Sequence, residues 1–260
     1  MCRLILAHGA FSVPAVLDAA VAMSTGRTAD HDGPTQVHPN GWGAVWSAAD
    51  APHGFGVHRD VRPLAESLDD SPLPGITTGF LAVHARHATL ARNSGLTCTH
   101  PLERPGPAPW WFMHNGFLPT VHRNLGLPAS RFDSREYFDW VVPHGADRLD
   151  ETQTLERLAA IEPGGSSGNA IVVNPRAAYV IHWSPPDVAA PRYFAMSLLQ
   201  TPDFTVVASE VVPELAPAGS WTPLKPGSVL EIPLPPGHRR QNHPQSQPQN
   251  RQGDEHHAVL

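Results

Sequence analysis

The sequence predicts one large α+β domain built mainly from antiparallel sheets. Segments with strand-like apolar patterns outnumber helical ones and come in consecutive runs, without the regular strand–helix alternation that marks a parallel sheet. Proline makes up 29 of the 260 residues, well above its usual share of ~5%, which favours short elements and long connections over a helical bundle. Hydrophobic residues make up 41% of the chain, enough for a substantial core.

The first half of the chain combines short strands with long polar connections. An apolar strand is predicted over residues 3–8, and Ser12 can cap a helix over 13–23 that carries Pro14 in its first turn. A polar loop rich in Gly and Pro follows. Four more strands are expected, at residues 41–47, 54–59, 76–86 and 110–114.

The second half supplies the other helices and a run of strands. Helices are predicted over 134–142 and 151–161. Strands are predicted over 169–173, 178–183, 192–199, 204–208 and 229–232. The last 26 residues are mostly polar and cannot bury enough apolar surface to offset the entropy of ordering them. We therefore expect a domain over residues 2–234 and a disordered polar tail over 235–260.

Composition argues against several classes of protein. A net charge of −6 and a pI of about 6.2 give no basic surface for nucleic acid or an anionic membrane. No apolar run reaches the ~18 residues of a membrane span, and no signal peptide is visible. Two cysteines do not make a disulfide framework, so the cytoplasm is the expected location. No HExxH or CxxC pattern is present, and we expect neither a metal nor a cofactor.

Cys2 is the most informative single residue. Methionine aminopeptidases remove Met1 when the next side chain is small, and the mature chain would then carry a thiol and a free α-amine on one residue. The α-amine titrates near pH ~8 and can act as the base for the thiol. The alternative is a cysteine that merely begins a buried strand. Cys98 is interpreted as a small buried residue.

Three further segments fit chemistry on an amide. The side-chain amide of Asn115 and the N–H of Gly116 lie at a turn and can donate to one oxyanion, although an ordinary Asn-Gly turn has the same residues. Arg86, at the end of a predicted strand, can bind a carboxylate with two parallel donors, or can be a solvated charge. Asp133 can hold an ammonium group or simply cap a helix.

In order and spacing, these segments resemble the class II glutamine amidotransferase domains, which are N-terminal-nucleophile (Ntn) hydrolases. The resemblance covers about residues 2–232. With its Cys-Arg opening and short length, the chain is most similar to the stand-alone γ-glutamyl amidohydrolases of thiol metabolism. The matching segments are Met1-Cys2-Arg3, Asn40-Gly41-Trp42-Gly43, His84-Ala85-Arg86-His87-Ala88-Thr89, Thr99-His100-Pro101-Leu102, His114-Asn115-Gly116, Asp133-Ser134 and Ala208-Ser209-Glu210.

The resemblance implies a four-layer αββα sandwich and a set of roles. It implies that Cys2 is the nucleophile, that Asn115 and Gly116 form the oxyanion hole, and that Arg86 and Asp133 hold the α-carboxylate and α-amine of a glutamyl group. We also expect Thr89 and His100 to contribute to substrate binding, His100 from a loop that lines the site and not as a base.

The function expected from these residues is hydrolysis of a γ-glutamyl amide, glutamine or a γ-glutamyl compound, through a Cys2 thioester. One alternative is a glutaminase subunit that delivers ammonia to a separate synthase, since no phosphate-binding loop or second domain is visible. A further alternative is a non-catalytic binding protein on the same fold.

Overall fold

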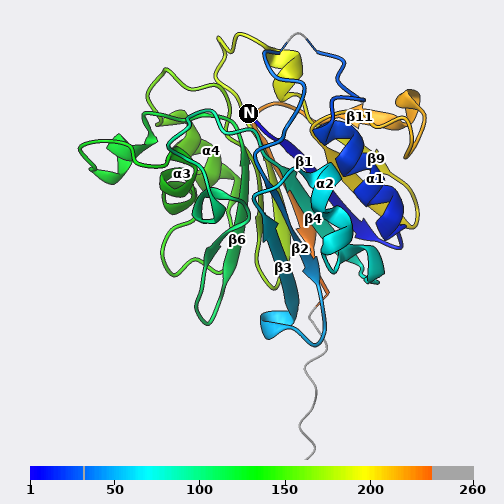
Figure 1. Ribbon diagram of the computed structural model, residues 1–260. Helices are drawn as coiled ribbons and strands as arrows, with labels where there is room; N and C mark the ends of the chain where they lie inside the picture. The colour runs from blue at the N-terminus through cyan, green and yellow to red at the C-terminus, as the bar shows by residue number, and fades with distance from the viewer. Residues whose placement is uncertain (32, 236–260) are drawn as a thin grey trace, which may run out of the picture.

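The computed structural model describes residues 1–31 and 33–235, and it contains two antiparallel sheets stacked face to face (Figure 1). One sheet has seven strands in the order β11-β9-β10-β1-β4-β2-β3, and the other has five in the order β12-β8-β7-β6-β5. The strands are β1 (Arg3–Gly9), β2 (Trp42–Ser47), β3 (Phe55–Asp60), β4 (Phe80–Ala85), β5 (Leu102–Arg104), β6 (Trp110–Asn115), β7 (Asn169–Val173), β8 (Ala177–His182), β9 (Ser197–Gln200), β10 (Phe204–Ala208), β11 (Trp221–Pro223) and β12 (Ser228–Pro233).

Helices cover the outer face of each sheet. The helices α1 (Val13–Ser24) and α2 (Leu64–Ser67) lie against the seven-stranded sheet, and α3 (Asp133–Val141) and α4 (Glu151–Ala159) lie on the opposite side of the molecule (Figure 1). The Ser12 hydroxyl accepts a hydrogen bond from the Ala15 N–H, as expected for the cap of α1. The α+β class and the αββα order of layers are thus confirmed.

Three apolar cores separate the four layers. Along β1, Ile5 and Ala7 pack toward α1, whereas Leu4 and Leu6 belong to the core between the two sheets. A third core lies between the five-stranded sheet and α3 and α4. Successive side chains of a strand point to opposite faces, so each strand of the central layers serves two cores. This alternation decides which polar side chains reach the space between the sheets.

The predicted boundaries differ from the structure in a few places. The strand predicted over 76–86 occupies only β4, and the one predicted over 192–199 begins with a 3-10 turn, so that β9 starts at Ser197. Pro191 opens this turn. The three-residue strands β5 and β11 were not predicted, because they are too short to show alternation. The predicted tail lies outside the described residues except for Pro235. No helix of the described chain is long and apolar enough to cross a bilayer.

Candidate active site

Cys2 lies where β1 enters the seven-stranded sheet, at the edge of the space between the two sheets. The register pairs Arg3 with Ala85 and Leu4 with His84, which places Cys2 opposite Arg86. Since Leu4 faces the other sheet, Cys2 lies on the same face. The side chain of Cys2 is buried. Its sulfur lies 3.7 Å from the His87 carbonyl oxygen, to which the thiol donates.

Asn115 reaches Cys2 from the opposite sheet. It is the last residue of β6, and its Oδ1 accepts a hydrogen bond of 2.9 Å from the backbone N–H of Cys2. The Nδ2 of the same amide is buried and has no hydrogen-bond partner among the described residues. A buried donor of this kind is rare in a folded protein. The arrangement fixes the backbone of Cys2 and leaves the NH2 group of the amide beside it without a described partner.

Gly116 follows Asn115 and has no room for a side chain. A Cβ atom at this position would lie 1.8 Å from the carbonyl oxygen of Ser167 and 2.7 Å from Nε2 of His114. In the part of the chain that the structure describes, its backbone N–H makes no hydrogen bond to another backbone group. Within the described chain, the Asn115 side chain and the Gly116 backbone thus carry adjacent N–H donors, one of them buried without a partner.

The surroundings of Cys2 favour the thiolate. Burial alone raises the pKa of the thiol, but the imidazole of His84, the N-terminal amine and the backbone of His87 lower it more, and the net result is a pKa of about 6. A thiol with that pKa is largely ionised at neutral pH, and the thiolate is the nucleophilic form.

Met1 precedes Cys2 and is held in place. Its carbonyl oxygen accepts a hydrogen bond of 3.2 Å from the Tyr193 hydroxyl, and its sulfur lies 3.4 Å from the Ser166 hydroxyl. Burial lowers the pKa of its amine, and the charges of Arg3 and Arg86 lower it further. A free amine on Cys2 requires that Met1 be removed.

Arg86 is a buried cation that forms no ion pair within the described residues. Its guanidinium donates to the carbonyl oxygens of Asn40, at 3.4 Å, and Asn93. Within residues 1–31 and 33–235, no carboxylate forms an ion pair with it. Asp133 begins α3, is also buried, and accepts a hydrogen bond of 2.9 Å from the Leu118 N–H. Asp133 therefore lies against the segment that follows Gly116.

The other two residues expected to bind substrate lie differently. His100 is buried with its ring 4.4 Å from that of His84, so it stands next to His84, and none of its described contacts is with Cys2. Thr89 is exposed on the loop that follows Arg86. Cys98, expected to be buried, is half-buried in a 3-10 turn.

The sequence interpretation gave no role to two features near Cys2. Arg3 forms a buried ion pair of 2.6 Å with Glu210, whose other oxygen accepts from Thr28, so the start of the chain is tied to the end of β10. His84 points into the space between the sheets beside Cys2. Side chains along β4 alternate between its two faces, so the register of β4 against β1 puts His84 on the inner face.

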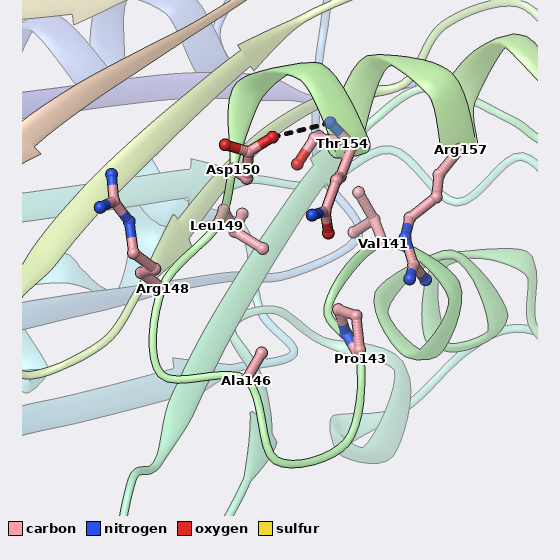
Figure 2. Close-up of a pocket in the computed structure, with 9 residues that line it drawn as sticks. Val141, Pro143, Ala146, Arg148, Leu149, Asp150, Thr154 and Arg157 are labelled. Atoms are coloured by element: carbon pink, nitrogen blue, oxygen red, sulfur yellow. Dashed lines mark hydrogen bonds between the residues drawn. The ribbon is translucent and has the colours of Figure 1, made fainter.

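A cavity of about 290 Å³ lies elsewhere, between the end of α3, the connection after it and the start of α4 (Figure 2). Its lining includes Arg148, Asp150 and Arg157, and none of the residues around Cys2 belongs to it. In the described chain, no group of three or more His, Cys, Asp or Glu side chains is placed to hold a metal ion.

Known structures share this fold. The allosteric regulatory enzyme of purine biosynthesis superposes over 90% of this chain with 16% identity and a TM-score of 0.65. Glutamine phosphoribosylpyrophosphate amidotransferase from B. subtilis superposes over 89%, with 16% identity and a TM-score of 0.62. A glutamine aminotransferase class-II domain protein from Silicibacter pomeroyi matches over 89% of this chain and 94% of its own, with 19% identity and a TM-score of 0.55.

The present chain spans about half of the first two enzymes, 47% of each. No protein-family profile and no curated sequence matches it. At 16–19% identity the similarity establishes the fold. The chain therefore has the fold of the class II glutamine amidotransferase domains, as the order of its motifs predicts.

Proposed function

We propose that this protein hydrolyses a γ-glutamyl amide through a thioester on Cys2. The observation that carries the proposal is the pairing of Cys2 with Asn115: the amide oxygen fixes the backbone of Cys2, and the amide nitrogen is buried beside it with no partner among the described residues. A buried Cys with a pKa of about 6 supplies the thiolate that such a reaction needs.

The chemistry uses the groups in a fixed order. After removal of Met1, the thiolate attacks the side-chain carbonyl carbon and forms a C–S bond. The oxygen becomes an anion that the Nδ2–H of Asn115 and the N–H of Gly116 can bind. The C–N bond then breaks, and the departing nitrogen takes up a proton and leaves as ammonia or an amine. Water cleaves the thioester, and the glutamyl group leaves as glutamate.

Recognition of the glutamyl group falls to two buried charges. Arg86 has no anionic partner in the described chain, so the α-carboxylate of the substrate would supply one. Asp133 would bind the α-ammonium group, and Thr89 and His100 complete the proposed substrate site. A buried cation that is paired only when substrate binds gives selectivity for an anionic substrate, because an uncharged analogue leaves it unpaired.

A second candidate is a glutaminase subunit that passes ammonia to a separate synthase. The observation in its favour is that this fold makes up about half of each of two longer enzymes, one of them named an amidotransferase. A binding protein without catalysis is a third candidate, and it requires no mature N-terminal cysteine. For all three we propose a cytoplasmic location, since the two cysteines are free.

The test is turnover of the purified mature protein on glutamine and on a panel of γ-glutamyl amines and peptides, with glutamate and the released amine both quantified. Intact mass first establishes whether Met1 has been removed. Rapid turnover of a γ-glutamyl amine, with glutamine a poor substrate, supports the hydrolase. Turnover of glutamine alone, stimulated by a second protein, supports the glutaminase subunit. A mature protein with an N-terminal Cys and no turnover on any member contradicts both.

A further inference from the structure

The register of the central strands brings one imidazole to the nucleophile. His84 pairs with Leu4, and both side chains lie on the face between the sheets. Cys2 lies two residues before Leu4 on the same strand and face, so it is the diagonal neighbour of His84. Side chains in this relation are close enough for direct contact. His84 is completely buried, so the ring has no access to solvent.

The hydrogen bonds of His84 assign its tautomer. Its Nε2 lies 3.1 Å from the carbonyl oxygen of His114. A carbonyl oxygen only accepts, so Nε2 carries the hydrogen and Nδ1 carries the lone pair. Nδ1 is buried and has no hydrogen-bond partner among the described residues. A basic nitrogen without another described partner is therefore held next to a buried thiol, whose pKa the same imidazole lowers by charge and by hydrogen bonding.

The other buried histidines around the site cannot play this role. Burial lowers the pKa of His38 to about 2, and Arg3 and the N-terminal amine lower it further. Burial also holds the pKa of His100 well below its usual range. Burial outweighs the opposing effect of Asp133 and lowers the pKa of His114, whose two nitrogens are engaged with Ser134 and Ser167.

Besides His84, the groups of the described chain that act on the Cys2 thiol are the N-terminal amine and the backbone of His87. Arg86 lies across the strand pair, but its guanidinium donates to the carbonyls of Asn40 and Asn93 and cannot accept a proton at neutral pH. In the mature protein the N-terminal amine is the nitrogen of Cys2 itself, which donates to Oδ1 of Asn115. His84 is thus the side chain next to the thiol that has both a lone pair and a fixed orientation.

We propose that His84 is the proton acceptor of the Cys2 thiol, so that the resting nucleophile is a thiolate paired with the His84 imidazolium. The S–H bond breaks, its electron pair stays on sulfur, and the proton moves to Nδ1. The catalytic part of this inference rests on the proposed hydrolysis. The proton held by His84 passes to the departing nitrogen, with the α-amine of Cys2 as the relay, and His84 takes up a proton from water when the thioester is cleaved.

The balance of this cycle is complete without another reactant. One proton leaves the thiol and reaches the leaving amine, and one proton from the attacking water returns to His84. The hydroxide equivalent ends in the carboxyl group of glutamate, and the sulfur is released as thiolate. The two bases have different tasks, since His84 ionises the thiol and the α-amine serves the substrate nitrogen.

The test compares His84→Gln with His182→Gln in mature protein with Cys2 at the N-terminus. Gln preserves a donor toward the His114 carbonyl but has no basic nitrogen. His182 is a buried histidine of β8 that makes no contribution to the thiol pKa. The rate of alkylation of Cys2 by iodoacetamide is followed against pH, with Cys2 and Cys98 distinguished by mass spectrometry.

We expect a midpoint near pH 6 for the wild type and the His182 variant, matching the lowered pKa. The midpoint for His84→Gln should move by about two units toward the ordinary thiol value of ~8.5. Its kcat/KM should fall by about 10²–10⁴ at pH 7 and partly recover as pH rises through the new midpoint. An unchanged midpoint in His84→Gln overturns the proposal.

Wild-type protein provides a measurement that does not depend on the stability of the variant. With ¹⁵N-labelled histidine at pH 7, the His84 ring should give the signal of an imidazolium, and alkylation of Cys2 should convert it to a neutral ring. A ring that is neutral before alkylation contradicts the ion pair. If the alkylation midpoint shifts in His84→Gln but no γ-glutamyl compound is cleaved, the thiolate–imidazolium pair is supported and the proposed function is refuted. If γ-glutamyl compounds are cleaved but the midpoint is the same in His84→Gln, only the thiolate–imidazolium pair is refuted.

Discussion

Asn115 allows the sharpest separation of catalysis from stability, because its two side-chain atoms have different tasks. Oδ1 accepts the 2.9 Å bond from the Cys2 N–H, and Nδ2 is the unpaired donor. Asn115→Asp keeps an acceptor for Cys2 and replaces the donor with a negatively charged oxygen. Asn115→Ala removes both atoms. The two variants therefore test the donor and the anchor in different combinations.

The magnitudes follow from those contacts. Loss of one oxyanion donor typically lowers kcat by ~10²–10³. We expect at least this loss in Asn115→Asp, since the new charge also repels the oxyanion, and a Tm lowered about as much as in a matched Asn→Asp change elsewhere in the core, because a buried carboxylate replaces a neutral amide. Asn115→Ala should lose a similar factor in kcat. It should also lose ~1–3 kcal/mol of stability, the cost of leaving the buried Cys2 N–H unpaired.

The assay is steady-state release of glutamate, together with thermal unfolding of each variant. Asn169→Asp is the matched control, since Asn169 pairs with Asn115 across β6 and β7 and is equally buried. Its amide is engaged with the Phe194 carbonyl and the Trp183 N–H. This control should lower Tm while the folded enzyme keeps its kcat. Wild-type kcat in Asn115→Asp would refute the assignment of Nδ2 as the oxyanion donor.

Cys2→Ala should abolish turnover with little effect on Tm, and a diazoketone analogue of glutamine should label Cys2 and spare Cys98, whereas labelling of Cys98 alone would place the nucleophile elsewhere. Arg86→Lys keeps the charge but loses the paired donors, so KM for γ-glutamyl substrates should rise by about 10–100-fold. Asp133→Asn should also raise KM. Wild-type kinetics in both variants would show that the substrate binds elsewhere. An uncleavable N-terminal tag should abolish turnover, and a tag that is cleaved to leave Cys2 as the first residue should restore it. Full activity of the tagged form would show that the α-amine takes no part in catalysis. Because the lowered thiol pKa makes the reactive thiolate dominant above pH about 6, kcat/KM should decline as pH falls below that value, and a profile that is flat from pH 5 to 8 would contradict this.

Much of the fold was accessible from local patterns. Strands such as β7 and β10 have the predicted bounds, because each is a run of apolar residues that suit burial. The cap of α1 was likewise identified from Ser12 and Pro14 alone. The three-residue strands and the turn at Pro191 were not, because pairing with a neighbour decides them and their own residues do not.

The candidate site also divides into residues that the sequence indicates and features that depend on contacts between distant segments. The order of motifs pointed to Cys2 and Asn115, and the structure joins them by a hydrogen bond between the sheets. The setting of His84 depends on the register of β1 against β4, and the requirement for Gly at position 116 depends on the carbonyl of Ser167, about fifty residues away. Such facts arise only when distant segments meet, so a single sequence does not contain them.

The position of β1 in the middle of the seven-stranded sheet has a consequence for biosynthesis. This strand is made before its two partners, β4 and β10, and β10 emerges about 200 residues later. At ~5–20 residues per second, translation of that stretch takes about 10–40 s. β4 emerges earlier and can pair with one edge of β1, but the other edge of β1 has no partner until β10 is made. The sheet that holds Cys2 is therefore completed late in synthesis, after any enzyme that trims Met1 has had access to an extended end. The high contact order of this pairing also makes slow folding the expected behaviour.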